Sequence, residues 1–404
     1  MQTRVTVPVV LALLAVLPGR MAAQELTPAE LVDAIVRDGP RAQAIRSAVE
    51  VTHREQLSRT AFPNPSVGYS REGAGFTEFL QVQQFLPLFG VRDALSQAGV
   101  AATAAAEAER DAQLWNLRAD AEVLVASLKA AQARLDVTRS TVAQTEALIG
   151  VLRIREQEGE GSRFDRLRAE QELLEARQDT VEAVIRAVEA RATLRGWLPQ
   201  SVRFSSVTGD LYRDEVVPAV EVLVARAVAG RRELQALARS AERADHEAEA
   251  ARKARMPSPG LFGGLKRADG VDERLAGALF GVTVSVPLLD NGSRDVARWR
   301  AEATRVTADR SSITQAIETD VMRAAEVLNV RRQAFTAVGD DLSSGEELAG
   351  IAEIAYREGE IGILELLDAY RTTERARLRA IGVRLDARLA QIALQRAVGE
   401  RLWP

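Results

Sequence analysis

Residues 356–370 read YREGEIGILELLDAY, and a degraded copy of this stretch, REQEGEGSRFDRLRAE, occupies residues 155–170. Glycine, glutamate, leucine and alanine recur at matching places in the two copies. In each copy an acidic, glycine-containing turn stands between a long amphipathic segment that arrives and another that leaves. Because glycine adopts the backbone conformations that end helices, both stretches are predicted to be the tips of helical hairpins.

The composition excludes several classes of protein. The chain has 404 residues, 47% hydrophobic and only 4% aromatic, as expected where long helices pack closely. It has no cysteine, so disulfides and thiolate metal sites are excluded, and no cofactor or metal is expected. The two histidines, His53 and His246, stand alone on predicted helices, where a solvated helix face accounts for them. The formal net charge of -4 provides no basic surface for nucleic acid.

Nothing in the sequence indicates an enzyme. It contains no phosphate-binding glycine loop, no nucleophile with a nearby histidine and no H-E-x-x-H motif. Gly73 and Gly75 begin a glycine-rich pattern, but the third glycine is missing and the pair lies in a predicted strand turn.

The N-terminus has the pattern of a secretory signal peptide. Arg4 precedes an apolar run from Val5 to Leu17, and small residues follow a Pro-Gly break. Residues 1–23 are therefore predicted to be removed after Ala23, and the mature protein to be exported. No later segment is long and apolar enough for a transmembrane helix, so any entry into a membrane is expected to use β-strands.

The mature chain repeats one plan twice. Residues 24–199 form the first repeat and residues 217–404 the second, each predicted to contain a helix, a β-hairpin, a long helix, a tip and a return helix. Residues 200–216 lose all periodicity and are predicted to be the connector.

Hydrophobic periodicity indicates that the helices after the strands are very long. From Leu114 to Leu152, residues of a heptad seam recur at alternate steps of three and four. With its alanine-rich start, this helix would be about 95 Å long, too long for a compact domain. The return helix after the first tip has a stripe at steps of seven: Leu167, Leu174, Val181 and Val188.

Two segment pairs, one in each repeat, instead alternate with a period of two, which is typical of strands with one apolar face. The lipid-facing set is expected to be Leu80, Val82, Phe280, Val282, Val284 and Val286. The opposite, lumenal set is expected to be Gln81, Gln83, Thr283 and Ser285. Four strands of about ten residues cannot close a barrel, so at least two chains would have to share one, and three would supply twelve strands. The alternative on pattern alone is a small soluble sheet that caps a coiled coil.

This sequence resembles those of the TolC-like outer membrane factors, which are the exit ducts of tripartite efflux pumps and type I secretion systems. The resemblance covers essentially the whole mature chain. It depends on the doubled plan, on the strand-to-helix junctions FLPLFGVRDA and VSVPLLDNGSRDVARWRAEA, and on the tip YREGEIGILELLDAYRTTERARL. The short chain and short connector are most similar to the heavy-metal branch, which serves cobalt, zinc and cadmium resistance.

The resemblance implies a mainly α fold with a small β part. Four β-strands per protomer would join in a trimer to give a shared 12-stranded outer-membrane barrel. A long α-helical periplasmic tunnel of coiled-coil hairpins would continue it.

The resemblance also implies two roles for the tips. The residues that would contact a periplasmic adaptor are Gly159, Glu160, Gly161, Leu167, Gly359, Glu360, Gly362, Leu366 and Leu367. The alternative for these leucines is packing within their own hairpin. The periplasmic gate would include Tyr356, Glu365 and Asp368, although Ile361 stands where well-studied members have an arginine. In a trimer the two acids would form rings that favour cations. The alternative is that they belong to a solvated helix face, which would contain the same acids.

The function expected from the resemblance is a passive outer-membrane exit channel of a tripartite efflux pump, with heavy-metal cations as one possible cargo. Its partners would be two further copies of the chain, a periplasmic adaptor, an inner-membrane transporter of the RND type and outer membrane lipid. The competing function is a periplasmic coiled-coil adaptor or scaffold, although an adaptor would have one hairpin flanked by β-rich domains. A soluble structural coiled coil is a third reading, against which the signal peptide and the alternating strands argue.

Overall fold

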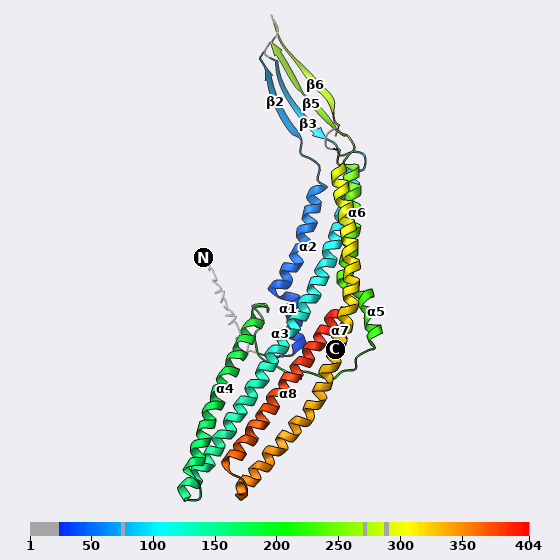
Figure 1. The fold of residues 1–404 in the computed structure, drawn as a ribbon. Coiled ribbons are helices and arrows are strands. Elements are labelled where there is room, and N and C mark those ends of the chain that lie inside the picture. The colour runs from blue at the N-terminus through cyan, green and yellow to red at the C-terminus, as the bar shows by residue number, and fades with distance from the viewer. Residues whose placement is uncertain (1–23, 74–76, 270–272, 287–290, 404) are drawn as a thin grey trace, which may run out of the picture.

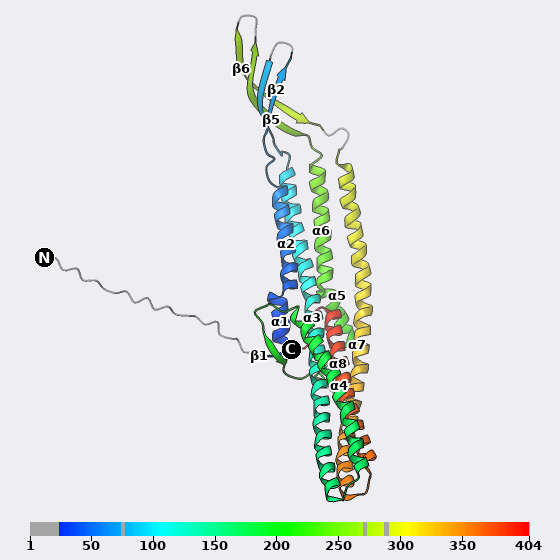
Figure 2. The same cartoon turned by 90° about the vertical axis from the view of Figure 1, so that its left-hand side faces the viewer.

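The computed structural model describes residues 24–73, 77–269, 273–286 and 291–403. It is an elongated molecule with long strands at one end and two helical hairpins pointing away from them at the other (Figure 1). The turned view shows the same division, with the two hairpin tips side by side at the far end (Figure 2). The predicted signal peptide lies outside the described residues. The predicted fold class, mainly α with a small β part, is confirmed.

Each repeat contributes two shorter helices followed by two longer ones. In the first repeat they are α1 (Pro28–Asp38), α2 (Pro40–Arg59), α3 (Val91–Glu158) and α4 (Arg163–Arg195). In the second they are α5 (Val220–Gly230), α6 (Arg232–Lys253), α7 (Ser293–Glu358) and α8 (Ile363–Val398). Across the described residues, no helix combines the length and the apolar character needed to cross a membrane.

Local sequence determines where the first two helices begin and end. The Thr27 hydroxyl accepts a hydrogen bond from the Glu30 N–H at 3.3 Å, and the Glu30 carboxylate accepts one from the Thr27 N–H at 2.8 Å. This capping box starts α1, and Pro28 occupies the first helical position, where no N–H is needed. Gly39 and Pro40 then separate α1 from α2.

The four long strands form one antiparallel sheet in the order β2-β3-β5-β6. Their bounds are β2 (Ser66–Glu72), β3 (Thr77–Phe85), β5 (Ser258–Asp269) and β6 (Arg274–Ser285). The β3–β5 pair joins the two repeats, with Leu80 opposite Leu265. Within the described chain, β2 and β6 each have a neighbour on one side only, so the sheet has two open edges.

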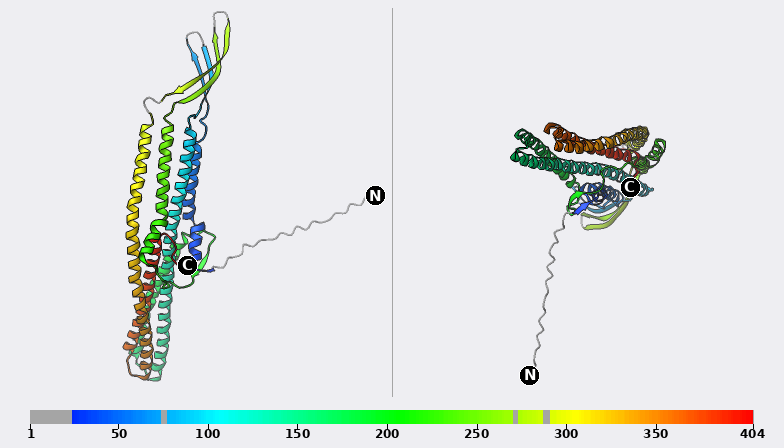
Figure 3. Two further views of the ribbon diagram at one scale, coloured as in Figure 1. Left: turned by 90° about the vertical axis from the view of Figure 1, so that its right-hand side faces the viewer. Right: turned by 90° about the horizontal axis from the view of Figure 1, so that it is seen from below.

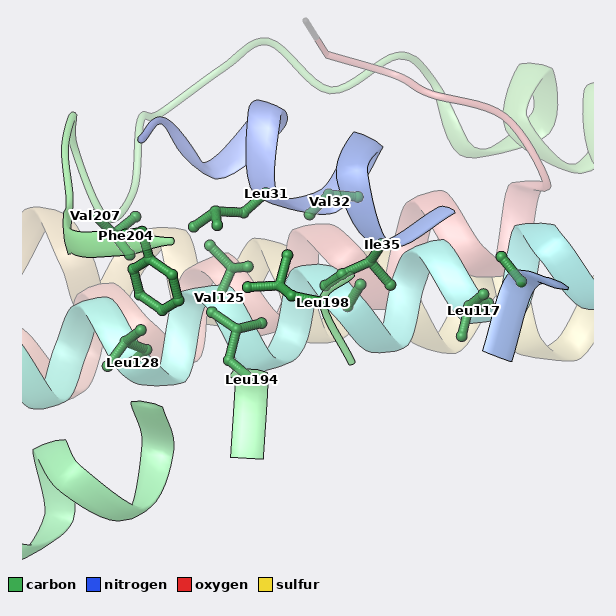
Figure 4. Packing of buried hydrophobic residues seen from close by; sticks show 12 residues of the cluster. Leu31, Val32, Ile35, Leu117, Val125, Leu128, Leu194, Leu198, Phe204 and Val207 are labelled. Atoms are coloured by element: carbon green, nitrogen blue, oxygen red, sulfur yellow. The ribbon is translucent and has the colours of Figure 1, made fainter. Parts of the chain in front are cut away.

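The connector is more structured than its sequence predicts. It contains β4 (Phe204–Val207), which pairs in parallel with β1 (Gln24–Leu26). Phe204 and Val207 are buried beside Leu128 of α3 (Figure 4). A strand of four residues is too short to show a period in the sequence, and it was therefore not predicted. Its pairing with β1 and its contacts with α3 hold it in place.

The helices form an open layer whose order follows that of the strands. Toward the sheet, α2 packs on α3, α3 on α6 and α6 on α7; toward the tips, α4 packs on α3, α3 on α8 and α8 on α7. Seen from below, this helical part is wide and thin (Figure 3). The layer therefore has one edge at α2 and α4 and another at α7.

Several apolar cores are spaced along the layer. Near its middle, Leu31 and Ile35 of α1 pack with Val125 of α3 and Leu194 of α4 (Figure 4). A corresponding core in the second repeat joins α5, α7 and α8, and another fills the hairpin tips. Packing thus occurs along the length of the rods rather than around a single centre.

The heptad seam of α3 faces the other helices as predicted, because all its positions from Leu114 to Leu152 are buried or half-buried. The expected stripe of α4 behaves differently. Alanines instead face α3, with Ala169, Ala176 and Ala183 all buried. Two stripes with the same step of seven cannot be distinguished by period, and the smaller side chains allow the closer helix approach. The exposed stripe is Leu167, Leu174, Val181 and Val188, with exposed fractions of 44%, 57%, 58% and 61%.

A buried ion pair ties α2 to α6. The Arg59 guanidinium donates to both carboxylate oxygens of Glu247, at 2.6 and 2.7 Å, and the Glu247 side chain is only 2% exposed. Arg59 also donates to the Gln56 amide oxygen at 2.9 Å. These bonds hold the two repeats together just below the sheet.

We expect Arg59→Met to lower the free energy of unfolding by about 3 kcal/mol, because it leaves the Glu247 carboxylate buried without a partner. Urea titration in detergent, followed by circular dichroism at 222 nm, measures the change. Arg252→Met is the matched control, since Arg252 pairs with Glu249 on the exposed surface of α6, and it should cost less than about 1 kcal/mol. Equal losses in the two variants would contradict the assigned role of the buried pair.

Candidate functional site at the hairpin tips

Both hairpins turn through the same backbone motif. Gly159 ends α3 with φ 78° and Gly359 ends α7 with φ 79°, left-handed values that favour glycine. The N–H groups of Glu160 and Glu360 each donate to the carbonyl oxygen five residues earlier, at 2.9 and 2.8 Å. These bonds close Schellman motifs, so both predicted tips are turns between helices.

The following glycine is needed for different reasons at the two tips. A Cβ on Gly161 would lie 2.8 Å from the Arg155 Cβ and 2.9 Å from the Glu156 backbone nitrogen, so only glycine fits. A Cβ on Gly362 would meet the Glu365 carboxylate at 2.9 Å, and that flexible side chain can move away. The first tip is therefore the tighter of the two.

The two tips are stabilised by different chemistry at matching positions. In the first hairpin, Arg166 donates to Glu156 at 2.5 Å and to Glu170 at 2.7 Å. In the second hairpin, the apolar Leu366 takes the place of this arginine. The first tip is thus closed by ion pairs and the second by an apolar core.

Two leucines expected to contact an adaptor belong to this core. Leu366 and Leu367 are 1% and 3% exposed and pack with Ile149 and Leu152 of the other hairpin. In this structure the two leucines therefore pack at the junction of the hairpins, where α8 crosses α3, rather than at the exposed surface of the tip. Leu167 is the one exposed leucine of the three.

Other apolar side chains, which sequence reasoning missed, are exposed at the tips. Val151, Ile154 and Phe164 are exposed on the first hairpin. The matching positions of the second hairpin are also exposed: Ile351, Ile354 and Leu364. The signal that could have revealed them is their recurrence in both repeats. We name these six residues the tip patches.

The three predicted gate residues lie on the second hairpin. Tyr356 is half-buried in the tip core, below the Arg155 guanidinium at 5.8 Å from its ring. Burial, and then the charge of Asp165, raise the pKa of its hydroxyl. Glu365 and Asp368 are exposed and one turn apart on α8. They form one acidic surface beside the tip.

A polar contact above the tip joins the hairpins. The Tyr370 hydroxyl of α8 donates to the Glu353 carboxylate of α7 at 2.8 Å, and the Gln144 amide of α3 donates to the same oxygen at 3.2 Å. Burial and this hydrogen bond raise the pKa of Tyr370. Tyr370, rather than Tyr356, is the tyrosine with a side-chain hydrogen bond across the described tip region.

Arg371 provides a second contact between the hairpins. Its guanidinium makes an ion pair with Glu172 of α4 and lies 3.2 Å from the Glu175 carboxylate. Above this contact, α4 and α8 separate and leave a groove of about 800 Å³ over α3. Asp179 and Glu374 line the groove, and burial followed by neighbouring carboxylates raises the pKa of Asp179. The Arg371 contact near the tip is therefore attractive. Farther from the tip, the carboxylates that line the groove repel one another.

The strand register places the predicted membrane residues on shared faces. Leu80, Val82, Phe280, Val282 and Val284 lie on one face of the sheet, because opposing residues of antiparallel strands point the same way. Val286 follows the end of β6 and is exposed. The expected lumenal residues lie on the opposite face: Gln81, Gln83, Thr283 and Ser285. Exposed residues of β2 and β5 that sequence reasoning missed complete the apolar face: Val67, Tyr69, Leu261 and Leu265.

Known proteins share the doubled chain plan, and one family matches both repeats. The sequence profile of the outer membrane efflux protein family matches residues 52–198 and 223–400. The chain belongs to this family. The family assignment places the chain in the outer membrane with an extension into the periplasm, and it confirms that the chain is not an enzyme.

One curated relative of this efflux protein is the cobalt-zinc-cadmium resistance protein CzcC of Cupriavidus metallidurans, 26% identical over 253 residues. The match covers 60% of this chain and 57% of CzcC, little more than half of that protein's length. The expected resemblance to the heavy-metal branch is confirmed. Among the described residues, no group of three or more His, Asp or Glu side chains is placed to hold a metal ion.

Solved structures of efflux channels have the same fold. The CmeC outer membrane channel of Campylobacter jejuni has a TM-score of 0.72 at 13% identity, with 93% of this chain and 87% of CmeC covered. The open state of the MtrE channel of Neisseria gonorrhoeae has a TM-score of 0.69 at 19% identity, with 93% and 89% covered. The helical layer and sheet are therefore those of an outer membrane efflux protein.

Gly161→Ala should destabilise the first tip, because its new methyl group would press against the backbone of α3. The expected result is a loss of amide protection at the tip, by about tenfold or more in hydrogen exchange. Gly150→Ala is the matched control, since Gly150 is an exposed helical residue where an added methyl group would have no atom within 4 Å. The control should leave protection unchanged or raise it. Unchanged exchange in Gly161→Ala would show that the turn has room to relax.

Proposed function

We propose that the chain forms, as a homotrimer, the outer membrane exit channel of a tripartite efflux pump. The observation that carries this proposal is the shared order of strands and helices. Both the sheet and the helical layer end at the same two sides of the protomer, with β2, α2 and α4 at one side and β6 and α7 at the other. If one side of each copy joined the opposite side of the next copy, the open edges of the sheet and of the helical layer would be covered together.

The exposed edges give a physical reason for this assembly. An open strand edge has unpaired N–H and C=O groups, which cannot remain so in lipid. Pairing β6 of one copy with β2 of the next removes both edges. Three copies supply twelve strands, an even number within the range of outer membrane proteins. An interface between unlike surfaces closes into a ring when the rotation per copy is suitable.

Apolar stripes lie at both helical edges and favour the same closure. On α4, the exposed stripe runs through Leu174, Val181 and Val188. On α7, Val327, Val330 and Leu348 are exposed. In the ring, the α4 stripe of one copy would cover the α7 stripe of the next copy. This contact would explain why α4 directs its larger side chains away from its own hairpin.

The tips would meet the hairpin tips of a periplasmic adaptor. The backbone of Gly159, Glu160, Gly161, Gly359, Glu360 and Gly362 would allow close approach, and Leu167 with the tip patches would add apolar contact. An inner-membrane transporter of the RND type would deliver the substrate. The similarity to CzcC supports heavy-metal cations as the cargo.

The gate would consist of the acidic surface and the two contacts between hairpins. In a trimer Glu365 and Asp368 would form acidic rings that attract cations. Tyr356 would pack beside them. Opening would require the second hairpin, α7 and α8, to shift away from the first, and therefore the Arg371–Glu172 and Gln144–Glu353 contacts to loosen.

The first experiment is to purify the mature protein from outer membranes in detergent, measure its unboiled mass and record conductance in a planar bilayer. The parent should be a trimer that conducts. Leu174→Glu should reduce the trimer fraction at least about tenfold, because each copy would bury a carboxylate at the interface. Leu174→Met retains the apolar surface and should behave as the parent. A monomer that stays soluble without detergent and passes no current would refute the channel.

The gate proposal predicts a change in ion selectivity. In the double variant Glu365→Gln, Asp368→Asn, the preference for potassium over chloride should fall severalfold, because the acidic rings are neutral. Reversal potentials in a potassium chloride gradient measure this preference. Glu221→Gln removes an exposed charge from α5, away from the tips, and should leave selectivity unchanged. Unaltered selectivity in the double variant would place both acids on a solvated outer face.

A further inference from the structure

The apolar face of the sheet ends in a row of charged side chains at the hairpin-loop end of the strands. Arg71 on β2, Glu78 on β3 and Arg267 on β5 are register neighbours, with Glu78 opposite each arginine. One step farther out, Asp269 on β5 lies opposite Arg274 on β6. All five belong to the face that contains Leu80 and Val82, so the charges continue directly from the apolar surface.

The charges are confined to one end of this face. Toward the helices, the described strand residues of the same face are Val67, Gln84, Pro259 and Val284, none of them charged. Between Val284 and Ala276 the apolar part of β6 is about 25 Å long, the height of the apolar band of outer membrane proteins. Tyr69 lies at the boundary, where its hydroxyl donates to Glu78 at 3.2 Å. An aromatic ring with a polar end is typical of a membrane interface.

The row has an excess of arginine. Arg71 lies 3.9 Å from Glu78, and Arg274 lies 3.2 Å from Asp269. Arg267 is exposed and makes no ion pair among the described residues. Among the described residues of this row, three guanidinium groups therefore face two carboxylates, and we call this row, with its net positive charge, the collar above the apolar band.

We propose that Arg71, Arg267 and Arg274 bind the phosphate groups of lipid headgroups in the outer leaflet. The guanidinium fork matches phosphate oxygens and forms charge-assisted hydrogen bonds with them. The apolar surface next to the collar would hold the acyl chains of the same molecule, so the collar fits a phosphorylated lipid rather than a free anion. The inference rests on the proposed function, because it takes this face as the one turned toward the membrane.

In a trimer the collar would recur three times around the outer rim. It would fix the depth of the sheet in the membrane, since the guanidinium groups remain at the headgroup level while Leu80 and Val82 remain among acyl chains. The opposite face has Lys266 over the Phe79 ring at 5.3 Å but no comparable row of arginines in the described strands.

The test uses the purified full-length protein in neutral detergent, titrated with bisphosphorylated lipid A and analysed by native mass spectrometry. The parent should bind the lipid, and the triple variant Arg71→Gln, Arg267→Gln, Arg274→Gln should bind it at least about tenfold more weakly. The triple variant Arg153→Gln, Arg163→Gln, Arg357→Gln removes the same charge at the hairpin tips and should bind as the parent does. If the collar variant does not assemble, Arg267→Gln alone should still weaken binding severalfold.

Two probes identify the source of the phosphate. Lipid A without its phosphates should bind weakly to the parent. Inorganic phosphate at about 10 mM, in a buffer of about physiological ionic strength, roughly 0.15 M, should not displace the intact lipid. Equal binding of the dephosphorylated lipid, or displacement by phosphate alone, would overturn the proposal, as would normal binding by the collar variant. The unboiled mass and conductance of each variant are measured in parallel. A conducting trimer that fails to bind lipid A refutes only the collar.

Discussion

The structure depends on two helices that are too long to be buried within one chain. α3 has 68 residues and α7 has 66, so each is a rod of about 100 Å. α1, α2, α4, α6 and α8 all pack along α3, and α5, α6 and α8 along α7. Because a rod offers contact along its length but no centre, the chain becomes an open layer with edges. Those edges lead to the proposed assembly.

Duplication explains why the layer is regular, and divergence explains why its two halves behave differently. Both tips retain the same turn, at Gly159 and Gly359. Around these turns, the Arg166 ion-pair network of the first hairpin is replaced in the second by Leu366 and an apolar core. An ion-paired tip resists local opening through directional bonds, whereas an apolar contact can slide. This difference is consistent with a gate on the second hairpin.

Much of the candidate site was predictable, but the exposure of its side chains was not. The turns at Gly159 and Gly359 follow from glycine and its spacing, and the strand faces follow from a period of two. The burial of Leu366 and Leu367 depends on where α8 crosses α3, which no local pattern records. Tyr370 and Arg371 were missed for the same reason, because their partners, Glu353 and Glu172, come from other helices.

The sequence alone determined the elements, since helix period, strand alternation, proline and glycine act over a few residues. It thereby determined the doubled plan and the family resemblance. Tertiary structure decided which of two equal stripes on α4 is buried, that of Ala176 or that of Leu174. It also decided that β4 forms in the connector and that the arginines of β2, β5 and β6 meet on one face. These features depend on distances between segments far apart in the chain, and residue periodicity contains no such information.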